Sequence, residues 1–188
     1  MHKDEYIMKE YEDIRGEIKQ KIELHNSLIT FMITTVVAVL AFALERNNSA
    51  LYLLPFAIII PISMRVTYYR TAMLKLSAYA IVYLENELRG INWETRNVQL
   101  MNDNKNKIFD KLTISHYYEG IVLGIVCYLL YFLDYIKGKE INIQTAVFLA
   151  LPILLVVWEG VITKRIITFN DERNEWIKIW RDFKNSNE

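Results

Sequence analysis

Basic and aromatic side chains are interleaved in two segments of this sequence, and they are its best candidates for binding chemistry. Arginine and lysine can pair with phosphates, and aromatic rings can stack on bases or on cations. The same residue types also suit packing beside anionic lipid headgroups, which is the more common use of any single one. The candidate ligand-binding residues are Arg65, Tyr69, Arg70, Arg173, Trp176, Lys178, Trp180 and Arg181.

A carboxylate, Glu159, lies in an apolar run beside Trp158 and Gly160. A charged group in a membrane segment is costly and usually faces protein or water. One copy from each subunit of a symmetric oligomer would form a ring of carboxylates, which favours cations. We therefore consider Glu159 a pore-lining candidate. The alternative is an interfacial glutamate near the end of the span, five residues before Lys164, and the sequence favours neither.

Small and hydroxyl side chains form a second candidate pore lining between residues 27 and 41. Their steps of three and four place them on one helix face. Such a stripe can border a wet path, or it can let helices approach closely, which is the commoner use. The hydroxyl residues Ser27, Thr30 and Thr34 are the pore-lining candidates.

Motifs of enzymatic chemistry are missing from the sequence. It has no glycine-rich phosphate loop, no HExxH and no GxSxG. Its three histidines are far apart, and Cys127 is the single cysteine, so neither a disulfide nor a multi-cysteine metal site can form within the chain. We expect a protein that is not an enzyme and that needs no cofactor or metal.

The elements that must position these residues are helices in a membrane. The chain has 188 residues, of which 53% are hydrophobic, and the apolar residues concentrate in four segments. Roughly 20 apolar residues cross a bilayer as a helix. Because the runs are apolar on every face, four of them would be hard to bury in water, which disfavours a soluble helical bundle. The segments are residues 24–44, 47–64, 120–133 and 141–158.

The flanking segments carry the charge. Of the 22 Lys and Arg residues, all but Arg46, Lys137 and Lys139 lie outside the two short loops within the pairs. The positive-inside rule then places both termini in the cytoplasm. Apolar periodicity predicts cytoplasmic helices over 3–23, 65–89 and 164–184, and the polar stretch 97–107 predicts a loop. The helix over 65–89 has two apolar faces, so one could meet a neighbouring subunit or both could pack within the chain.

The predicted fold is all-α: an integral membrane protein with four transmembrane helices in two hairpins and a cytoplasmic helical layer. Residues 1–100 hold the leading helix, the first hairpin and the helix after it, and residues 101–188 hold the second hairpin with its flanking helices.

The first half of the chain resembles the SLATT family of bacterial membrane proteins. The resemblance rests on the charged leading helix, the tight two-span hairpin and the helix that follows it. That helix carries Tyr69-Arg70-Thr71-Ala72, Leu74-Lys75, Tyr79 and Tyr83, which is similar to the family's YR-x-A-x-x-L-K-x-E pattern. Leu76 and Ser77 stand where the pattern would have an acidic residue, and the second hairpin is an addition to a minimal two-span member.

The resemblance implies an effector of bacterial anti-phage and nucleotide-signalling systems. Such an effector resides in the inner membrane and forms a pore that depolarises it and stops growth. A nucleotide or oligonucleotide made by a partner enzyme would gate the pore from the cytoplasm. One four-span chain is too small to enclose much of an aqueous pore, so we expect a homo-oligomer, most simply a tetramer. The alternatives are a non-conducting membrane scaffold that recruits a soluble partner and, less favoured, a small transporter.

Overall fold

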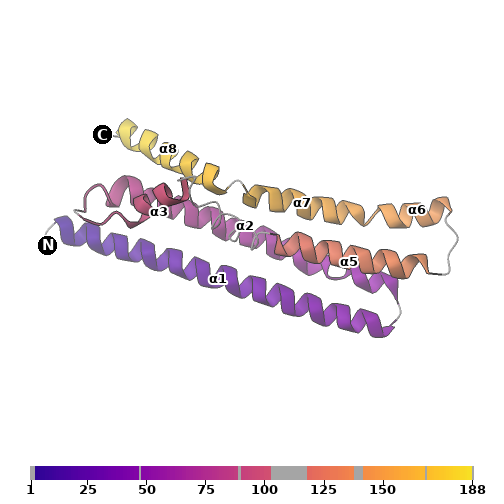
Figure 1. The fold of residues 1–188 in the computed structure, drawn as a ribbon. Coiled ribbons are helices and arrows are strands. Elements are labelled where there is room, and N and C mark those ends of the chain that lie inside the picture. The colour runs from indigo at the N-terminus through magenta and orange to yellow at the C-terminus, as the bar shows by residue number, and fades with distance from the viewer. Residues whose placement is uncertain are drawn as a thin grey trace. The chain divides into compact units, whose positions relative to one another are not determined.

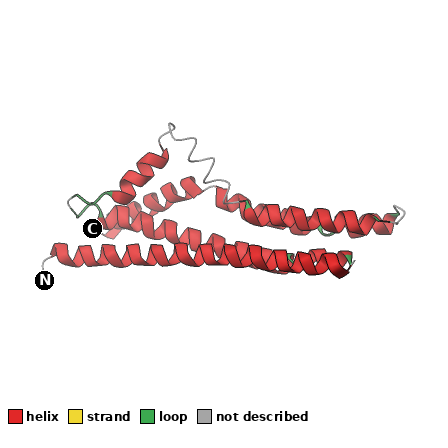
Figure 2. Cartoon of the chain, turned by 60° about the horizontal axis from the view of Figure 1, so that its bottom comes forward, coloured by secondary structure: helices red, strands yellow, loops and turns green. Residues whose placement is uncertain are grey.

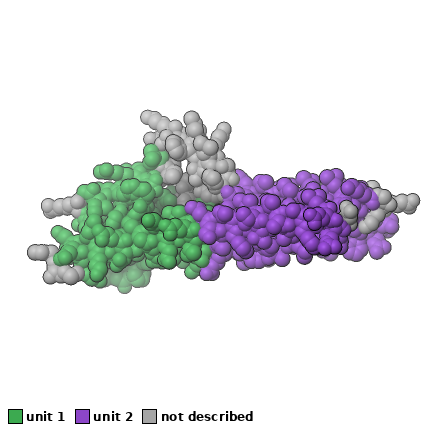
Figure 3. Space-filling view, turned by 90° about the horizontal axis from the view of Figure 1, so that it is seen from below, with its two compact units in different colours: residues 1–25, 68–113, 168–188 green, residues 26–67, 114–167 purple. Residues whose placement is uncertain are grey.

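The computed structural model describes residues 3–46, 48–88, 90–102, 118–137, 142–167 and 169–187. These residues form helices and turns and no strand, so the chain is all-α as predicted (Figures 1 and 2). They group into two compact units (Figure 3). Each unit draws on both of the halves, 1–100 and 101–188, that the sequence separates. Unit 1 comprises residues 1–25, 68–113 and 168–188, and unit 2 comprises residues 26–67 and 114–167.

Unit 2 contains the apolar helical segments. Within the described residues, four helices are long and apolar enough to cross a membrane, and each contributes residues to unit 2. These helices span Lys3–Arg46, Ser49–Leu84, Glu119–Ile136 and Ile143–Lys164. Many of their large apolar side chains lie on the surface, as Phe31, Leu129 and Leu154 do. Such a surface is unfavourable in water and suits lipid. The prediction of an all-α membrane protein is therefore confirmed.

The helices of unit 2 pack around a continuous apolar core. The first span is the second half of helix α1 (Lys3–Arg46), and the second begins with the 3₁₀ turn η1 (Ser49–Leu53) and continues as α2 (Phe56–Tyr79). The third is α5 (Glu119–Ile136). Side chains from all three fill the centre of the described part of unit 2, which is therefore packed. The central side chains are Met32, Val36, Phe56, Ile59 and Cys127.

A proline interrupts the fourth span, which consists of α6 (Ile143–Ala150) and α7 (Ile153–Ile167). Pro152 has no N–H to donate to the carbonyl of Phe148, four residues before it. The hydroxyl of Tyr131 donates to that carbonyl at 2.9 Å, and the hydroxyl of Tyr128 donates to the next one, of Leu149, at 3.2 Å. Two tyrosines of α5 thus satisfy carbonyls that the break exposes in an apolar setting.

Unit 1 contains the charged helices. It combines residues 3–25 of α1, the end of α2 with its π-helical continuation η2 (Ala80–Leu84), α3 (Trp93–Asn102) and α8 (Phe169–Asn187). The predicted helix after the second span is confirmed as far as Leu84. Residues of both of its apolar faces, among them Ala80 and Ile81, lie in the core of unit 1. This favours packing within the chain over a subunit contact. The core side chains include Ile7, Tyr11, Ala80, Leu84 and Leu88 in one cluster and Ala78, Ile81, Val82 and Ile177 in another.

The predicted loop over 97–107 is wrong in its first part, because residues 97–102 belong to α3. The remaining residues, 103–107, lie outside the described part of the chain. The asparagine-rich composition of this segment did not predict a helix. The helix begins earlier, at Trp93, and its start depends on Glu85. Glu85 accepts hydrogen bonds from the backbone N–H groups of Glu94 and Thr95 at 2.7 and 2.9 Å. It thereby satisfies donors that a helix N-terminus leaves open.

Candidate functional site

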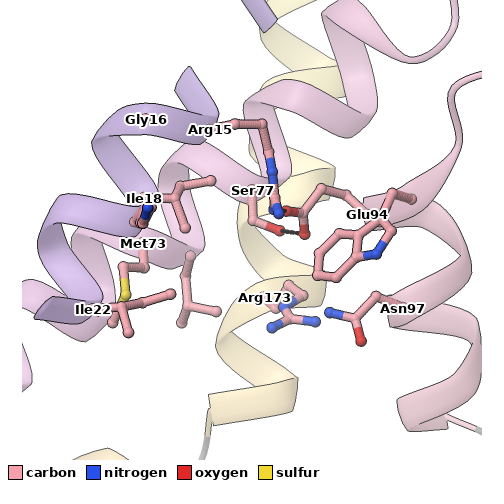
Figure 4. A pocket seen from close by; sticks show the side chains of 12 residues that line it. Arg15, Gly16, Ile18, Ile22, Met73, Ser77, Glu94, Asn97 and Arg173 are labelled. Atoms are coloured by element: carbon pink, nitrogen blue, oxygen red, sulfur yellow. Dashed lines mark hydrogen bonds and ion pairs between the residues drawn. The ribbon is translucent and has the colours of Figure 1, made fainter. Parts of the chain in front are cut away.

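A cavity of about 580 Å³ opens in unit 1, within the size range of small-molecule sites (Figure 4). Side chains of α1, α2, α3 and α8 surround it. One wall is apolar and consists of Ile18, Ile22, Met73 and Leu74. The polar lining consists of Arg15, Lys19, Ser77, Trp93, Glu94, Asn97 and Arg173.

Arg15 and Lys19 reach the cavity from α1, where a step of four residues keeps them on one face. Arg15 is held on two sides by α3. Its Nη1 donates to Oε1 of Glu94 at 2.5 Å, and its guanidinium carbon lies 4.3 Å from the centre of the Trp93 ring. The planar guanidinium suits both contacts, the charge-assisted hydrogen bond and the position over the ring.

Glu94 is the acidic residue of the lining, and it is almost fully buried. Besides its contact with Arg15, its Oε2 accepts a hydrogen bond from the hydroxyl of Ser77 at 2.8 Å. Both carboxylate oxygens therefore have partners. Glu85 fixes the position of Glu94 through the backbone and also accepts a hydrogen bond from the hydroxyl of Thr95 at 2.6 Å. The carboxylate of Glu94 thus anchors one wall of the cavity.

Arg173 enters the cavity from α8, and its side chain is buried although it is charged. Figure 4 shows it beside Asn97 of α3. Of the three cationic side chains in the lining, Arg15 is balanced by Glu94. The described lining holds three cationic side chains and one carboxylate, so its formal charge is positive. This charge suits an anionic group such as a phosphate. The indole of Trp93, which is exposed, lies in the same lining.

The other candidate residues of α8 have different environments. The ring of Trp180 packs against those of Tyr79 and Tyr83, with ring centres 5.4 and 6.0 Å apart, and its Nε1 donates to the carbonyl of Lys75 at 3.2 Å. The ammonium of Lys75 lies 4.3 Å from the centre of the Trp176 ring. Both tryptophans therefore join α8 to α2 and do not line the cavity.

Tyr79 in this aromatic cluster donates to Oε1 of Glu10 at 2.5 Å. Burial and this hydrogen bond raise the pKa of Tyr79 to about 12. The phenol therefore stays neutral at physiological pH and acts as a structural donor.

Lys178 and Arg181 line a second, more polar hollow of about 470 Å³ between η2, α3 and α8. Asp182 lies in the same lining, together with the amides of Gln99 and Asn174. The described residues that line this hollow include no aromatic side chain, and their formal charges sum to one positive charge. It fits a phosphate-bearing base less well than the cavity with Trp93 does.

The candidates on α2 are not in either lining. Arg65 is exposed and belongs to unit 2, Tyr69 is partly buried, and Arg70 is buried in unit 1. The rings of Tyr68 and Tyr69 lie 5.8 Å apart. Of the eight predicted ligand-binding residues, the structure brings only Arg173 to the main cavity.

The hydroxyl candidates for a pore lining lie on the exposed face of α1. Ser27, Thr30 and Thr34 point away from the core that Met32 and Val36 enter. The threonine hydroxyls donate to carbonyls of their own helix, Thr30 to Asn26 at 3.0 Å and Thr34 to Thr30 at 2.9 Å. This face can therefore border water, lipid or a second copy of the chain. Glu159, by contrast, is buried inside unit 2.

Sequence reasoning missed most of the cavity. Arg15 and Lys19 lie more than 70 residues from Trp93 and Glu94 along the chain, and no local motif connects the two pairs. One signal was available in the sequence: Gly90, with Asn92 two residues later, is typical of a turn before a helix. In the structure Gly90 has a left-handed conformation with φ of 91°. That signal would have placed Trp93 and Glu94 in a first helical turn.

Comparisons with protein-family models, with curated proteins and with solved structures find no match to this chain.

Proposed function

We propose that the chain is the subunit of an oligomeric membrane channel whose conduction is controlled by a phosphate-bearing ligand bound in the cavity of unit 1. The observation that carries the proposal is the cavity itself. Its described lining combines three cationic side chains and one carboxylate with the indole of Trp93 and the amide of Asn97. A nucleotide or short oligonucleotide presents matching groups: phosphate for the cations, and a base for the ring and the amide.

Helix α1 supports a connection between ligand and pore. It is a single helix from Lys3 to Arg46, and it contributes Arg15 and Lys19 to the cavity and Ser27, Thr30 and Thr34 to the exposed face of unit 2. A ligand changes conduction only if it binds the open and closed states with different affinity. A change in the position of α1 at the cavity would be carried along the same helix.

The packed core of unit 2 is the reason for proposing an oligomer. Side chains fill the space between the helices of one chain, so ions would have to pass between copies. The hydroxyl face of α1 is the proposed lining of that path, and a tetramer is the simplest closed arrangement. The termini would be cytoplasmic, as the charge distribution favours.

The resemblance to the SLATT family supplies the biological setting of the proposal. In that setting the protein is an effector in the bacterial inner membrane. A partner enzyme makes the signal during phage infection, and the opened pore depolarises the membrane and arrests growth.

Ligand binding is tested with the full chain in lipid nanodiscs and a panel of nucleotides and short oligonucleotides. Arg173→Gln removes a cation from the cavity, and Lys178→Gln is the matched control, because it removes one from the second hollow. A charge-assisted hydrogen bond contributes about 1.5–3 kcal/mol, so Arg173→Gln should weaken binding by about 10- to 100-fold. Equal effects of the two substitutions would contradict the assignment of the cavity. Binding without any conduction would favour the scaffold.

A further inference from the structure

A buried carboxyl group lies among the helices of unit 2. Glu159 on α7 is only 1% exposed, although it lies in a segment apolar enough to cross a membrane. Its hydrogen-bond partner is Ser63 of α2, which is also buried. The second carboxyl oxygen, Oε2, is buried without a hydrogen-bond partner in the described part of the chain. The Ser63 hydroxyl therefore bonds to Oε1.

Gly120 of α5 completes the site. A Cβ atom at this position would come within 2.6 Å of the Ser63 hydroxyl oxygen and closer still to Oε1 of Glu159. A methyl group therefore does not fit, and the glycine leaves the space that the carboxyl and hydroxyl occupy. Three helices, α2, α5 and α7, thus meet at one polar contact. Thr163, one helical turn after Glu159, is buried as well.

No ion pair within the described residues includes Glu159. The ionisable side chains nearest to the site along the three helices are Arg65 on α2, Glu119 on α5 and Lys164 on α7. Arg65 and Lys164 are exposed, and Glu119 would add negative charge. Within the described residues, an ionised Glu159 would thus be a buried charge with no cation paired to it. A buried carboxyl in this situation is far less costly when it is neutral.

We propose that Glu159 is a proton-binding site, and that the proton is bound at neutral pH and keeps α2, α5 and α7 packed. A metal cation is the less suitable ligand, because cations take several oxygen ligands, and among the described residues Ser63 is the only hydrogen-bond partner of this carboxyl. Release of the proton leaves a charge in the packed interior and favours separation of the three helices. The site belongs to unit 2 and does not depend on the proposed ligand of unit 1.

The protonation state is measured by infrared spectroscopy of the full chain in lipid, because a protonated carboxyl and a carboxylate absorb at different frequencies. Exposed carboxyl groups are ionised at neutral pH, so a protonated band there reports a shielded group. Glu159→Gln keeps the size and polarity of the neutral form, and Glu175→Gln, at an exposed position of α8, is the control. We expect a protonated band at pH 7 that Glu159→Gln removes and Glu175→Gln leaves. Absence of the band, or its persistence in Glu159→Gln, overturns the proposal.

A second measurement does not depend on assigning that band. The folded state of the wild type binds a proton that the unfolded chain releases, so its stability is complete at low pH and falls as pH rises. Glu159→Gln cannot lose a proton and should show a smaller fall. Identical pH profiles of the two proteins contradict the proposal. A wild-type profile that shifts when sodium or potassium replaces an organic cation would identify a metal-cation site instead and would equally overturn it.

Discussion

Gly120→Ala tests the packing around the buried carboxyl of unit 2. The added methyl group would lie 2.6 Å from the Ser63 hydroxyl oxygen and would also overlap with Glu159, so something must move. Gly16→Ala on α1 provides the matched control, because nothing lies within 4 Å of the Cβ position there. The two substitutions are chemically identical, and both are in helices. Any difference between them therefore reports the surroundings.

The expected magnitude follows from three contributions. Forcing a methyl group into a filled site costs about 1–3 kcal/mol. Breaking the hydrogen bond between Ser63 and Glu159 leaves buried polar atoms unpaired and costs about 1–3 kcal/mol more. Alanine has a higher helix propensity than glycine, which offsets about 1 kcal/mol of this destabilisation. Together these give a destabilisation of about 3 kcal/mol for Gly120→Ala, whereas Gly16→Ala should stabilise by about 0.5–1 kcal/mol.

Thermal unfolding in lipid nanodiscs is the assay. At about 2–4 °C per kcal/mol for a chain of this size, Gly120→Ala should lower Tm by about 6–12 °C. Gly160→Ala is an intermediate case, since its Cβ would lie 3.5 Å from Cδ1 of Ile121, an ordinary contact, and we expect little change. A Gly120→Ala protein as stable as Gly16→Ala would refute the close approach of α5 to Glu159 and Ser63.

Three further substitutions test other contacts. Tyr131→Phe removes the donor to the carbonyl that Pro152 leaves open and should cost about 1–3 kcal/mol of unfolding free energy in the same assay; no loss would mean that this carbonyl finds another donor. Glu85→Ala removes the cap of α3 and should lower the free energy of unfolding by about 0.5–2 kcal/mol. Amide hydrogen exchange at Glu94 and Thr95 should be faster than in the wild type, and unchanged exchange would contradict the capping role. Tyr79→Phe should remove one tyrosine that ionises near pH 12 from an ultraviolet titration. Because that pKa lies above the usual tyrosine pKa of 10.0, the stabilisation by neutral Tyr79 is complete below pH 10 and is lost towards pH 12 in the wild type only. A titration that Tyr79→Phe leaves unchanged would show that the phenol is not shielded.

The architecture was predictable because it follows from local patterns. Runs without charge predicted the four apolar segments, and steps of three and four predicted a stripe of Ile7, Tyr11, Ile14, Ile18 and Ile22 on one helix face. Ile7, Tyr11 and Ile18 are buried in α1, Ile14 is partly buried, and Ile22 is exposed. The helix continues into the first span, and no proline separates the two parts. These features require only neighbours along the chain, and a pattern search finds them.

The cavity was not predictable in the same way, because tertiary contacts create it. The start of α3 depends on Glu85, whose role cannot be seen until the chain turns back at Gly90. Trp176 and Trp180 looked like ligand-stacking residues by their spacing to arginines, yet the structure uses them to join α8 to α2. Composition identifies which side chains could bind a ligand, but packing decides which of them reach it.

Ion flux through the full chain in liposomes, with and without added nucleotides and short oligonucleotides, tests the proposed function most directly. We predict flux that one of these ligands switches on or off, and a response that Arg173→Gln weakens more than Lys178→Gln does. The absence of flux under every condition, from protein shown to be folded and oriented in the bilayer, would contradict the channel and direct attention to a soluble partner.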